Sequence, residues 1–304
     1  MAFDDVYRDQ VALLIRTLPY VAAEDCLALK GGTAINLFHR EMPRLSVDVD
    51  LTYLPVADRE ESLRDIDRSL RRVSEQIQEA DPSAQITESA PASQNTIDKL
   101  FVRSQGAQIK IEVNPVLRGC VNEPELMEIC AKAEEQFGYA QNNVMSFADL
   151  FAGKIAAALD RQHPRDLFDV HQLLENEGIT DALRETLIVY LIGHQRSPAQ
   201  LLTAQCRNIE EEYRTAFYGM TEDDVSMETL VSTHADLTRN LVNNMSDAHR
   251  RFLASFYRRR PEWDLLGVDG VDRLPAVRWR EINLDRAGKE TQEAMARHME
   301  EVLG

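Results

Sequence analysis

The chain reads Gly31-Gly32-Thr33 at one predicted turn and Ser46-Val47-Asp48-Val49-Asp50-Leu51 at the next strand-like segment. Two glycines and a threonine that enter a helix offer free backbone N–H groups and a hydroxyl to phosphate oxygens. Asp48 and Asp50 alternate with apolar residues, so both carboxylates project from one face of a strand. Paired carboxylates repel each other unless a cation binds, and Mg²⁺ accepts such oxygen ligands. We therefore expect a phosphate-binding turn beside a metal-binding strand. The alternative is an ordinary turn followed by a solvated strand.

A second polar cluster downstream favours the functional interpretation. Lys154 and Arg161 lie near one face of a predicted helix, since positions three and four apart on a helix are neighbours. A lysine that points into a site with two carboxylates is a natural ligand for nucleotide phosphates. Asp166 and Asp169 are three positions apart on the following helix, so they too share a face. The alternative is two helices that are joined by a proline turn and held together by ion pairs, such as Arg161 with Asp166 or Arg165 with Asp169.

Length and composition set bounds on the fold and the compartment. With 304 residues, 44% of them hydrophobic, the chain is long enough for two cores or for one core with a helical appendage. No apolar run reaches the roughly 18–20 residues of a membrane span, and the acidic N-terminus does not resemble a secretory signal. The four cysteines are scattered, which is typical of reduced thiols in the cytoplasm and does not favour zinc. We expect a cytoplasmic protein that does not enter the membrane.

The formal net charge of −17 argues against a wide electrostatic contact with nucleic acid. A local basic groove remains open, and arginines are concentrated at 250–251, 258–260 and 278–280. The alternative is that these arginines lie at solvated helix ends and loops. A strongly acidic surface also suits a basic partner protein.

Hydrophobic periodicity predicts an α+β fold. The N-terminal part is expected to hold a small mixed sheet flanked by helices, and the C-terminal part to be mostly helical. We place the domains at residues 1–135 and 136–304. The expected helices and strands of the first part are helices at 4–22, 34–39 and 58–80, strands at 26–29 and 45–54, a loop at 83–94, and a hairpin of 99–104 with 108–114. Further helices are expected at 150–161, from Pro164, and at 181–193, 199–218, 226–243, 246–258 and 286–302.

Taken together, these motifs resemble a known family. The run from Leu29 to Ala34, with the pattern Arg44-x-Ser46-x-Asp48-x-Asp50, looks like the first motif of the AbiEii/AbiGii-type nucleotidyltransferase toxins. That family belongs to the polymerase-β-like superfamily. The segments at 149–157 and 161–169 are similar to its later motifs, and the tail at 261–263 and 274–279 has the same character. The similarity therefore spans most of the chain, and the ordered combination is more specific than the first motif alone.

The resemblance implies a nucleotidyltransferase that acts as the toxin of a type IV-like toxin–antitoxin or phage-defence system. Such an enzyme transfers a nucleotide from an NTP to an acceptor hydroxyl with the help of Mg²⁺. A tRNA 3′ end is the acceptor described for some relatives, and a cognate antitoxin protein is an expected partner.

The resemblance also assigns roles to residues. Ser46, Asp48 and Asp50 match the Ser/Thr-x-Asp-x-Asp positions, Lys154 matches the family's lysine, and Asp166 or Asp169 matches the last aspartate. Glu112 is expected on the polar face of the 109–114 strand as a third carboxylate, either as a metal ligand or as a base. Its alternative is a solvated residue paired with a neighbouring lysine. The expected nucleotide-binding residues are Gly31, Gly32, Thr33, Ser46, Lys154 and Arg165, and the expected metal ligands are Asp48, Asp50 and Glu112.

Two other hypotheses stay open. The acceptor could be a hydroxyl of a protein or a small molecule, since an acidic surface attracts cationic acceptors. The chain could also be a catalytically idle NTP-binding module that works through a partner, although the presence of Asp48, Asp50 and Lys154 argues against this.

Overall fold

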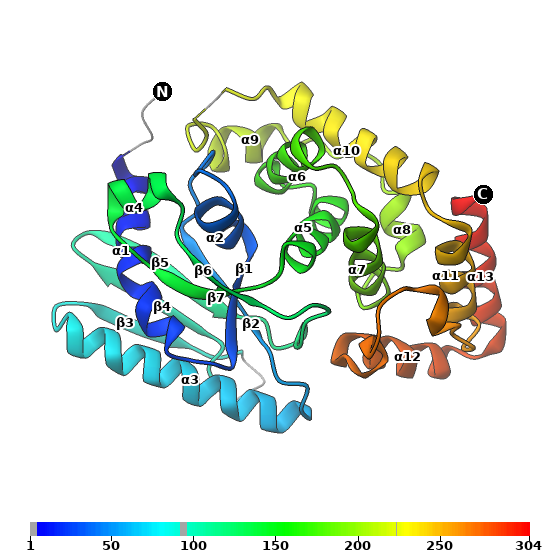
Figure 1. Cartoon of the computed structure of the whole chain (residues 1–304), viewed down its shortest axis with the longest axis horizontal. Helices are drawn as coiled ribbons and strands as arrows, with labels where there is room; N and C mark the ends of the chain where they lie inside the picture. Colours follow the sequence, from blue (N-terminus) through cyan, green and yellow to red (C-terminus); the bar gives the residue numbers. More distant parts are fainter. Residues whose placement is uncertain (1–4, 92–95, 223) are drawn as a thin grey trace. The chain divides into compact units, whose positions relative to one another are not determined.

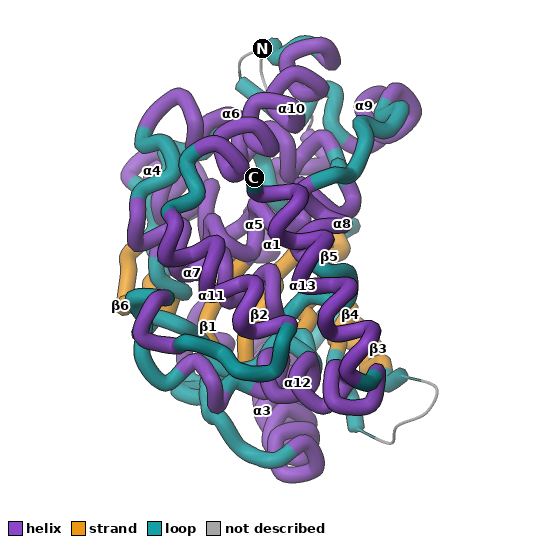
Figure 2. The backbone as a smooth tube through the Cα atoms, turned by 90° about the vertical axis from the view of Figure 1, so that its right-hand side faces the viewer, coloured by secondary structure: helices purple, strands orange, loops and turns teal. Residues whose placement is uncertain are grey.

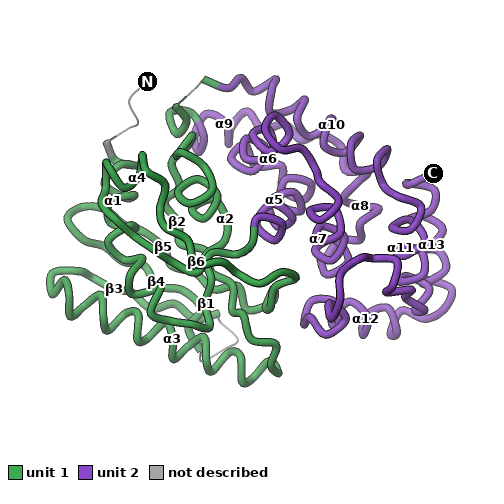
Figure 3. Tube along the Cα trace, viewed as in Figure 1, with its two compact units in different colours: residues 1–146, 218–224 green, residues 147–217, 225–304 purple. Residues whose placement is uncertain are grey.

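A computed structural model describes residues 5–91, 96–222 and 224–304. The chain divides into two compact units, coloured separately in Figure 3. Unit 1 runs up to Ser146 and also includes Tyr218–Asp224, and unit 2 comprises Phe147–Phe217 and Val225–Gly304. The assignment of domains to 1–135 and 136–304 stays a prediction.

Within the described residues, unit 1 contains one seven-stranded mixed sheet in the order β3-β4-β5-β2-β1-β7-β6. The pairs β2–β5 and β1–β7 are parallel, and the other neighbours are antiparallel. Figure 2 shows these strands in orange. The strands are β1 (Leu27–Lys30), β2 (Asp48–Tyr53), β3 (Gln85–Ser89), β4 (Lys99–Ser104), β5 (Ala107–Val113), β6 (Glu125–Glu128) and β7 (Gln141–Val144).

Two long helices cover the apolar face of this sheet. Helix α1 (Asp5–Ala22) packs on β5 and β7, and helix α3 (Arg59–Ala80) packs on β3 and β4 (Figure 1). The strands alternate as a half-buried sheet should: in β5, Ile109, Ile111 and Val113 are buried, whereas the residues between them are not. The opposite face of the sheet therefore carries polar side chains, and the two predicted aspartates lie there.

The predicted turn follows β1 without a loop. Helix α2 (Gly31–Ala34) starts directly after Lys30 and continues as the π-helical segment η1 (Ile35–His39). The helix predicted for 34–39 is confirmed in position, although its π-helical hydrogen bonding was not foreseen. Residues 43–45 then lead into β2.

A segment from far along the chain pairs with this entry to β2. Arg44 forms an isolated antiparallel bridge with Thr221, Leu45 N–H donates to the Met220 carbonyl (2.9 Å), and Glu222 N–H donates to the Pro43 carbonyl (3.0 Å). Residues 218–224 therefore complete unit 1, although the rest of the chain after Ser146 belongs to unit 2.

The described residues of unit 2 form helices joined by loops, and a mostly helical C-terminal part was predicted. Proline and hydroxyl residues set several helix starts, because Pro is favoured at the first turn and Ser or Thr side chains accept the first free N–H groups. Pro164 opens α6 and Ser197 forms a capping box with Gln200 at α8. The helices are α5 (Phe147–Arg161), α6 (Pro164–Asn176), α7 (Asp181–Ile192), α8 (Pro198–Leu202), α9 (Glu210–Ala216), α10 (Met227–Asn243), α11 (Asp247–Tyr257), α12 (Pro275–Ala287) and α13 (Lys289–Leu303), with short 3₁₀ turns η2 (Trp263–Leu265) and η3 (Val271–Arg273).

Several elements differ from the expectations. The loop predicted for 83–94 contains β3, and the single helix predicted for 199–218 is two helices, α8 and α9. Strands β6 and β7, helix α4 (Ala131–Phe137) and helix α12 were not predicted. Strand β3 is a polar, largely exposed edge strand, so it lacks the alternation that marks a strand in a sequence. Part of the predicted loop, residues 92–95, lies outside the described residues. No helix in the described part of the chain has the length and apolarity to cross a membrane.

Candidate functional site

The polar face of the unit 1 sheet carries one continuous row of charged side chains. Strand register places Lys30 opposite Asp50, Asp50 opposite Glu112, and Glu112 opposite Lys99. Asp48 lies in the adjacent row, opposite Lys110. Directly paired residues share a face of the sheet, so Asp48 and Asp50 do project from one face, as the alternation predicted.

The glycine turn lies directly against this row. Gly31 has φ +73°, and a Cβ added to it would stand 2.7 Å from Asp50 Oδ2. A Cβ at Gly32 would stand 2.5 Å from Arg44 Nη2 and 2.9 Å from Ser46 Oγ. Because real Cβ contacts are longer than this, neither position has room for a side chain. The glycines therefore bring a backbone turn into contact with one of the two aspartates.

Thr33 lies differently from the expectation. The sequence predicted that its hydroxyl would be offered to a phosphate, but the side chain is fully buried. Its hydroxyl donates to the main-chain carbonyl of Asp48 and lies 3.0 Å from Ser46 Oγ. In this structure Thr33 joins the turn to the start of β2, and its contact with a nucleotide stays a prediction.

Arg44 has a structural role that the sequence did not suggest. Its side chain is only 1% exposed, its Nη1 donates to the Leu45 carbonyl (2.9 Å), and its Nη2 lies beneath Gly32. A buried guanidinium needs such partners, because an uncompensated buried charge is strongly destabilising. Arg44 is part of the Arg44-x-Ser46 pattern in the sequence, but the spacing of that pattern does not show that the side chain packs against the Gly32 turn.

Glu112 is already paired with cations. Its two carboxylate oxygens lie 2.9 Å from Lys99 Nζ and 2.7 Å from Lys110 Nζ. Burial acts in the opposite direction, but the hydrogen bonds from Lys110 and Lys99 lower the pKa of Glu112. This matches the alternative of a strand residue paired with neighbouring lysines, and the role of Glu112 as a metal ligand or base stays a prediction.

With Glu112 paired to two lysines, Asp48 and Asp50 are the two remaining candidates among the three predicted metal ligands. Among residues 5–91, 96–222 and 224–304, no three His, Cys, Asp or Glu side chains are grouped to hold a metal ion. Asp48 and Asp50 still fit Mg²⁺ by donor chemistry, because Mg²⁺ is commonly bound by one or two carboxylates while substrate phosphates and water fill its other positions. The Gly31 turn places its backbone beside the Asp50 carboxylate.

Lys30 is a further charged group that sequence reasoning missed. It ends β1 one residue before Gly31 and lies opposite Asp50. Burial lowers the pKa of its ammonium group, and the nearby Asp50 and Glu112 carboxylates oppose that shift. Lys30 thus adds an amino group to the same row, beside the carboxylates of Asp50 and Glu112.

The second predicted cluster forms within unit 2. Lys154 Nζ lies 2.8 Å from Asp166 Oδ1 and 3.0 Å from Asp169 Oδ2, and all three side chains are buried. Arg161 Nη2 donates to Asp166 Oδ1 at 3.0 Å. The pKa of Asp166 is lowered, because the charges of Lys154 and Arg161 outweigh the effect of burial. The Arg161–Asp166 pair is one of the ion pairs that the alternative interpretation, two helices joined by ion pairs, predicted. The contact of Lys154 with both aspartates was not predicted.

Arg165 lies beside this cluster in the chain. It occupies the second position of α6, where its backbone N–H donates to His163 Nδ1 (3.2 Å). Its half-buried side chain belongs to the same helix as Asp166 and Asp169. Its assignment to nucleotide binding stays a prediction.

Two of the clustered arginines near the C-terminus, Arg258 and Arg259, form ion pairs with carboxylates of unit 2. Arg258 pairs with Glu293 (3.1 Å) and Glu300 (2.8 Å), and Arg259 pairs with Glu281 and Asp285. These contacts join α11 to α12 and α13. Arg258 and Arg259 follow the end of α11, as the alternative of a helix-end position predicts, but they are ion-paired with carboxylates of the same unit.

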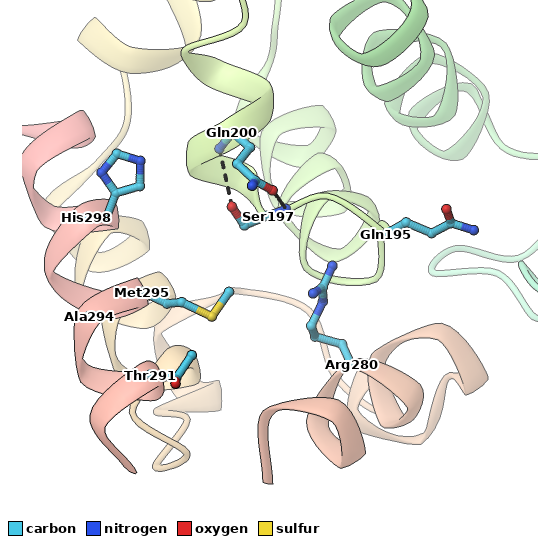
Figure 4. Close-up of a pocket in the computed structure, with 8 residues that line it drawn as sticks. All are labelled: Gln195, Ser197, Gln200, Arg280, Thr291, Ala294, Met295 and His298. Carbon is cyan, nitrogen blue, oxygen red and sulfur yellow. Dashed lines mark hydrogen bonds between the residues drawn. The ribbon is translucent and has the colours of Figure 1, made fainter. Parts of the chain in front are cut away.

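Arg280 belongs to the wall of a pocket in unit 2. The pocket has a volume of about 420 Å³ and lies among α8, α12 and α13 (Figure 4). The guanidinium donates to the carbonyl of Ile192 (3.2 Å) at the end of α7, and to those of His194 and Arg196 (3.2 Å) in the segment that follows. The residues predicted to be functional lie elsewhere. The lining comprises Gln195, Ser197, Gln200, Arg280, Thr291, Ala294, Met295 and His298.

Comparison with known proteins agrees with the motifs. The family model "Nucleotidyl transferase AbiEii toxin, Type IV TA system" matches residues 12–282. Among solved structures, MenT4, a nucleotidyltransferase toxin from Mycobacterium tuberculosis H37Rv, is similar with a TM-score of 0.61 and 17% identity. The match covers 86% of this chain and 92% of that chain, and it shows a shared fold. No curated protein matches the sequence. The expected family and the α+β fold class are confirmed.

Proposed function

Since the chain belongs to the AbiEii nucleotidyl transferase toxin family of type IV toxin–antitoxin systems, we propose that it transfers a nucleotide from an NTP to an acceptor hydroxyl with a divalent metal. The observation that carries this proposal is the contact between the Gly31 turn and the Asp50 carboxylate. A phosphate-binding backbone and a metal-binding carboxylate have to be neighbours if both are to bind one triphosphate.

Asp48 and Asp50 are the residues that would hold the cation, and Mg²⁺ suits their oxygen donors. When bound, such a cation neutralises negative charge on the phosphates. Glu112 is the candidate third carboxylate. For it to bind a metal, the ion pairs with Lys99 and Lys110 would have to rearrange.

The chain's own residues then have distinct tasks. The backbone N–H groups of Gly31 and Gly32 bind the β- and γ-phosphates, with Ser46 and Thr33 holding the turn on β2. Lys154 neutralises charge on the departing pyrophosphate, and Arg165 contacts the nucleotide. Asp166 and Asp169 hold the Lys154 ammonium group in place.

In the reaction, the acceptor oxygen forms a bond to the α-phosphorus while the bond between the α-phosphorus and the bridging oxygen to the β-phosphate breaks. Pyrophosphate leaves, and the hydroxyl proton passes to Glu112 or to water. No redox partner is needed. A tRNA 3′ end is the acceptor we propose, in a cytoplasmic reaction, with a cognate antitoxin as partner and phage defence as a biological role.

The test is a labelled-transfer assay. Wild-type protein and Asp48→Ala are incubated with each of the four α-labelled NTPs, total tRNA and a cell extract, with Mg²⁺ or with EDTA. We expect label on RNA only with wild-type protein and Mg²⁺, and loss of growth inhibition with Asp48→Ala. Label confined to protein or to a small molecule would contradict the tRNA acceptor while retaining the transferase. Equal labelling by wild type and Asp48→Ala would refute the assigned site.

A further inference from the structure

We propose that the acceptor strand binds the polar face of β5, β4 and β3, and that Phe101 stacks against one of its bases. We call this surface the outer polar face, and we define it by Thr87, Lys99, Phe101, Arg103 and Lys110. The inference rests on the proposed function, because it assumes a nucleic-acid acceptor, and it adds the residues that would position it.

Strand register shows that Phe101 shares a face with the predicted metal ligands. Phe101 pairs with Lys110 on one side and with Thr87 on the other, and Lys110 in turn pairs with Asp48. Directly opposed residues point to the same face, so the ring lies on the carboxylate side of the sheet. Two strand spacings separate Phe101 from Asp48, which is about 10 Å. That distance is roughly three times the 3.4 Å rise between stacked bases.

The sheet order indicates which side the acceptor uses. In β-strand order, β1 and β5 flank β2 on opposite sides. The Gly31 turn continues from β1, so the β- and γ-phosphates belong to the β1 side of Asp48 and Asp50. In-line transfer requires that the attacking oxygen and the departing pyrophosphate lie on opposite sides of the α-phosphorus. The acceptor therefore approaches over β5, and its preceding nucleotides extend over β4 and β3.

The chemistry of this face suits a single strand. Phe101 is half-buried rather than covered, and Lys99, Arg103 and Lys110 stand around it. Lys99 and Lys110 both pair with Glu112, and Asp48 lies opposite Lys110 on the β2 side of this surface. Arg103 is exposed and donates to Gln108 Oε1 (2.7 Å), the residue opposite it. Proteins that bind single strands combine aromatic rings for the bases with cations for the phosphates.

The apolar face of the same strands gives a contrast. Leu100 and Val102, the neighbours of Phe101 in the chain, are fully buried on the side that α3 covers. If Phe101 served only to fill the hydrophobic core, it would be expected on the face that α3 covers. Phe101 instead presents its ring among charged residues, where a base is a better partner than solvent.

The test compares Phe101→Ala with Phe101→Trp and with Leu126→Ala. Leu126 is 66% exposed on β6, at the opposite edge of the same sheet, so it controls for loss of an exposed apolar side chain. The readouts are KM and kcat for the tRNA fraction that wild-type protein labels, KM for the NTP, and circular dichroism with thermal unfolding to verify folding.

We expect Phe101→Ala to raise the acceptor KM about 5- to 100-fold, the range that loss of one stacked base produces, while the NTP KM and kcat change little. Phe101→Trp should retain wild-type values because it keeps an aromatic face, and Leu126→Ala should be neutral. An acceptor KM for Phe101→Ala equal to that of Leu126→Ala would overturn the inference. So would labelling of protein alone, although the transferase would stand. A wild-type protein that transfers no label to any acceptor would instead refute the proposed function.

Discussion

The backbone of Gly31 lies against the carboxylate of Asp50, so closely that a Cβ at Gly31 would stand 2.7 Å from Asp50 Oδ2. Gly31 also has φ +73°, a left-handed conformation that residues with a Cβ adopt at a cost. Glycine is therefore favoured at position 31 for two reasons: the backbone there is left-handed, and Asp50 leaves no room for a Cβ.

Replacing Gly31 with Ala should affect transfer much more than stability. The left-handed conformation alone costs about 1–2 kcal/mol, but the added Cβ also displaces Asp50. A displacement of about 1 Å at reacting groups can cost about 100-fold in rate, so we expect at least that loss in kcat. The control is Gly178→Ala, since Gly178 has φ +70° and open space around its Cα. It should lose stability and keep activity. Equal activity of the two variants would mean that Asp50 moves aside without consequence.

Asp48→Asn should abolish transfer without unfolding the protein. The change keeps the size of the side chain but removes one anionic ligand, and losing metal stabilisation worth several kcal/mol corresponds to at least about a 100-fold decrease in rate. Calorimetry with Mg²⁺ and a non-hydrolysable NTP analogue should show weakened binding. Glu79→Gln, at an exposed position near the end of α3, removes the same charge elsewhere and should behave as wild type. Retained transfer in Asp48→Asn would argue against its role as a metal ligand.

The Asp166 cluster should make stability depend on pH at the acid end. The pKa of Asp166 is lowered in the folded protein from its ordinary value of 3.8. Its contribution is therefore present above that value and is lost as the pH falls through the lower, folded-state pKa. We expect urea unfolding to show decreasing stability from about pH 5 downward.

Asp166→Asn should remove part of this pH dependence and cost about 3–5 kcal/mol at neutral pH, because it leaves Lys154 and Arg161 with less compensation in a buried cluster. Since Arg161 is itself largely exposed, we expect the lower end of that range. A variant with the same slope below pH 5 as wild type would show that other carboxylates produce the acid transition.

Glu112→Gln tests the third carboxylate. If Glu112 accepts the proton or binds the metal, kcat should fall about 100-fold or more. The loss of stability should be smaller than for Asp166→Asn, because the two lysine partners are part-exposed (34% and 30%) and water can solvate them. The matched control is Glu88→Gln, a strand glutamate that pairs with Arg71 (2.8 Å) and belongs to the face opposite Phe101. Unchanged kcat in Glu112→Gln would leave Glu112 as the partner of two lysines only.

Local patterns in the sequence predicted the elements closest to the site. The β1–α2–β2 unit follows from an apolar run, a glycine pair and an alternating segment, all of which act within a few residues. Helices α3, α10 and α11 were also predicted close to their observed bounds, and in the structure each begins at an Asp or Ser cap.

Elements that depend on distant partners were missed. Strand β7 reads Gln141-Asn142-Asn143-Val144, and strand β6 is mostly exposed, so neither has the sequence pattern of a strand. Both are strands because β7 pairs with β1 on one side and with β6 on the other. Context decides strand formation more than intrinsic preference does. The same limit applies to the site: the direction of the Thr33 hydroxyl and the burial of Arg44 beneath Gly32 depend on packing that no spacing encodes.

The pairing of residues 43–45 with Met220–Glu222 has a consequence for synthesis of the toxin. When the last strand of unit 1 leaves the ribosome, the entry to β2 still lacks its partner, which follows the five helices α5 to α9. At about 5–20 residues per second, translation of that stretch takes several seconds. The nascent chain therefore passes through a stage in which the residues of β2 have been made but the segment that pairs with the entry to β2 has not.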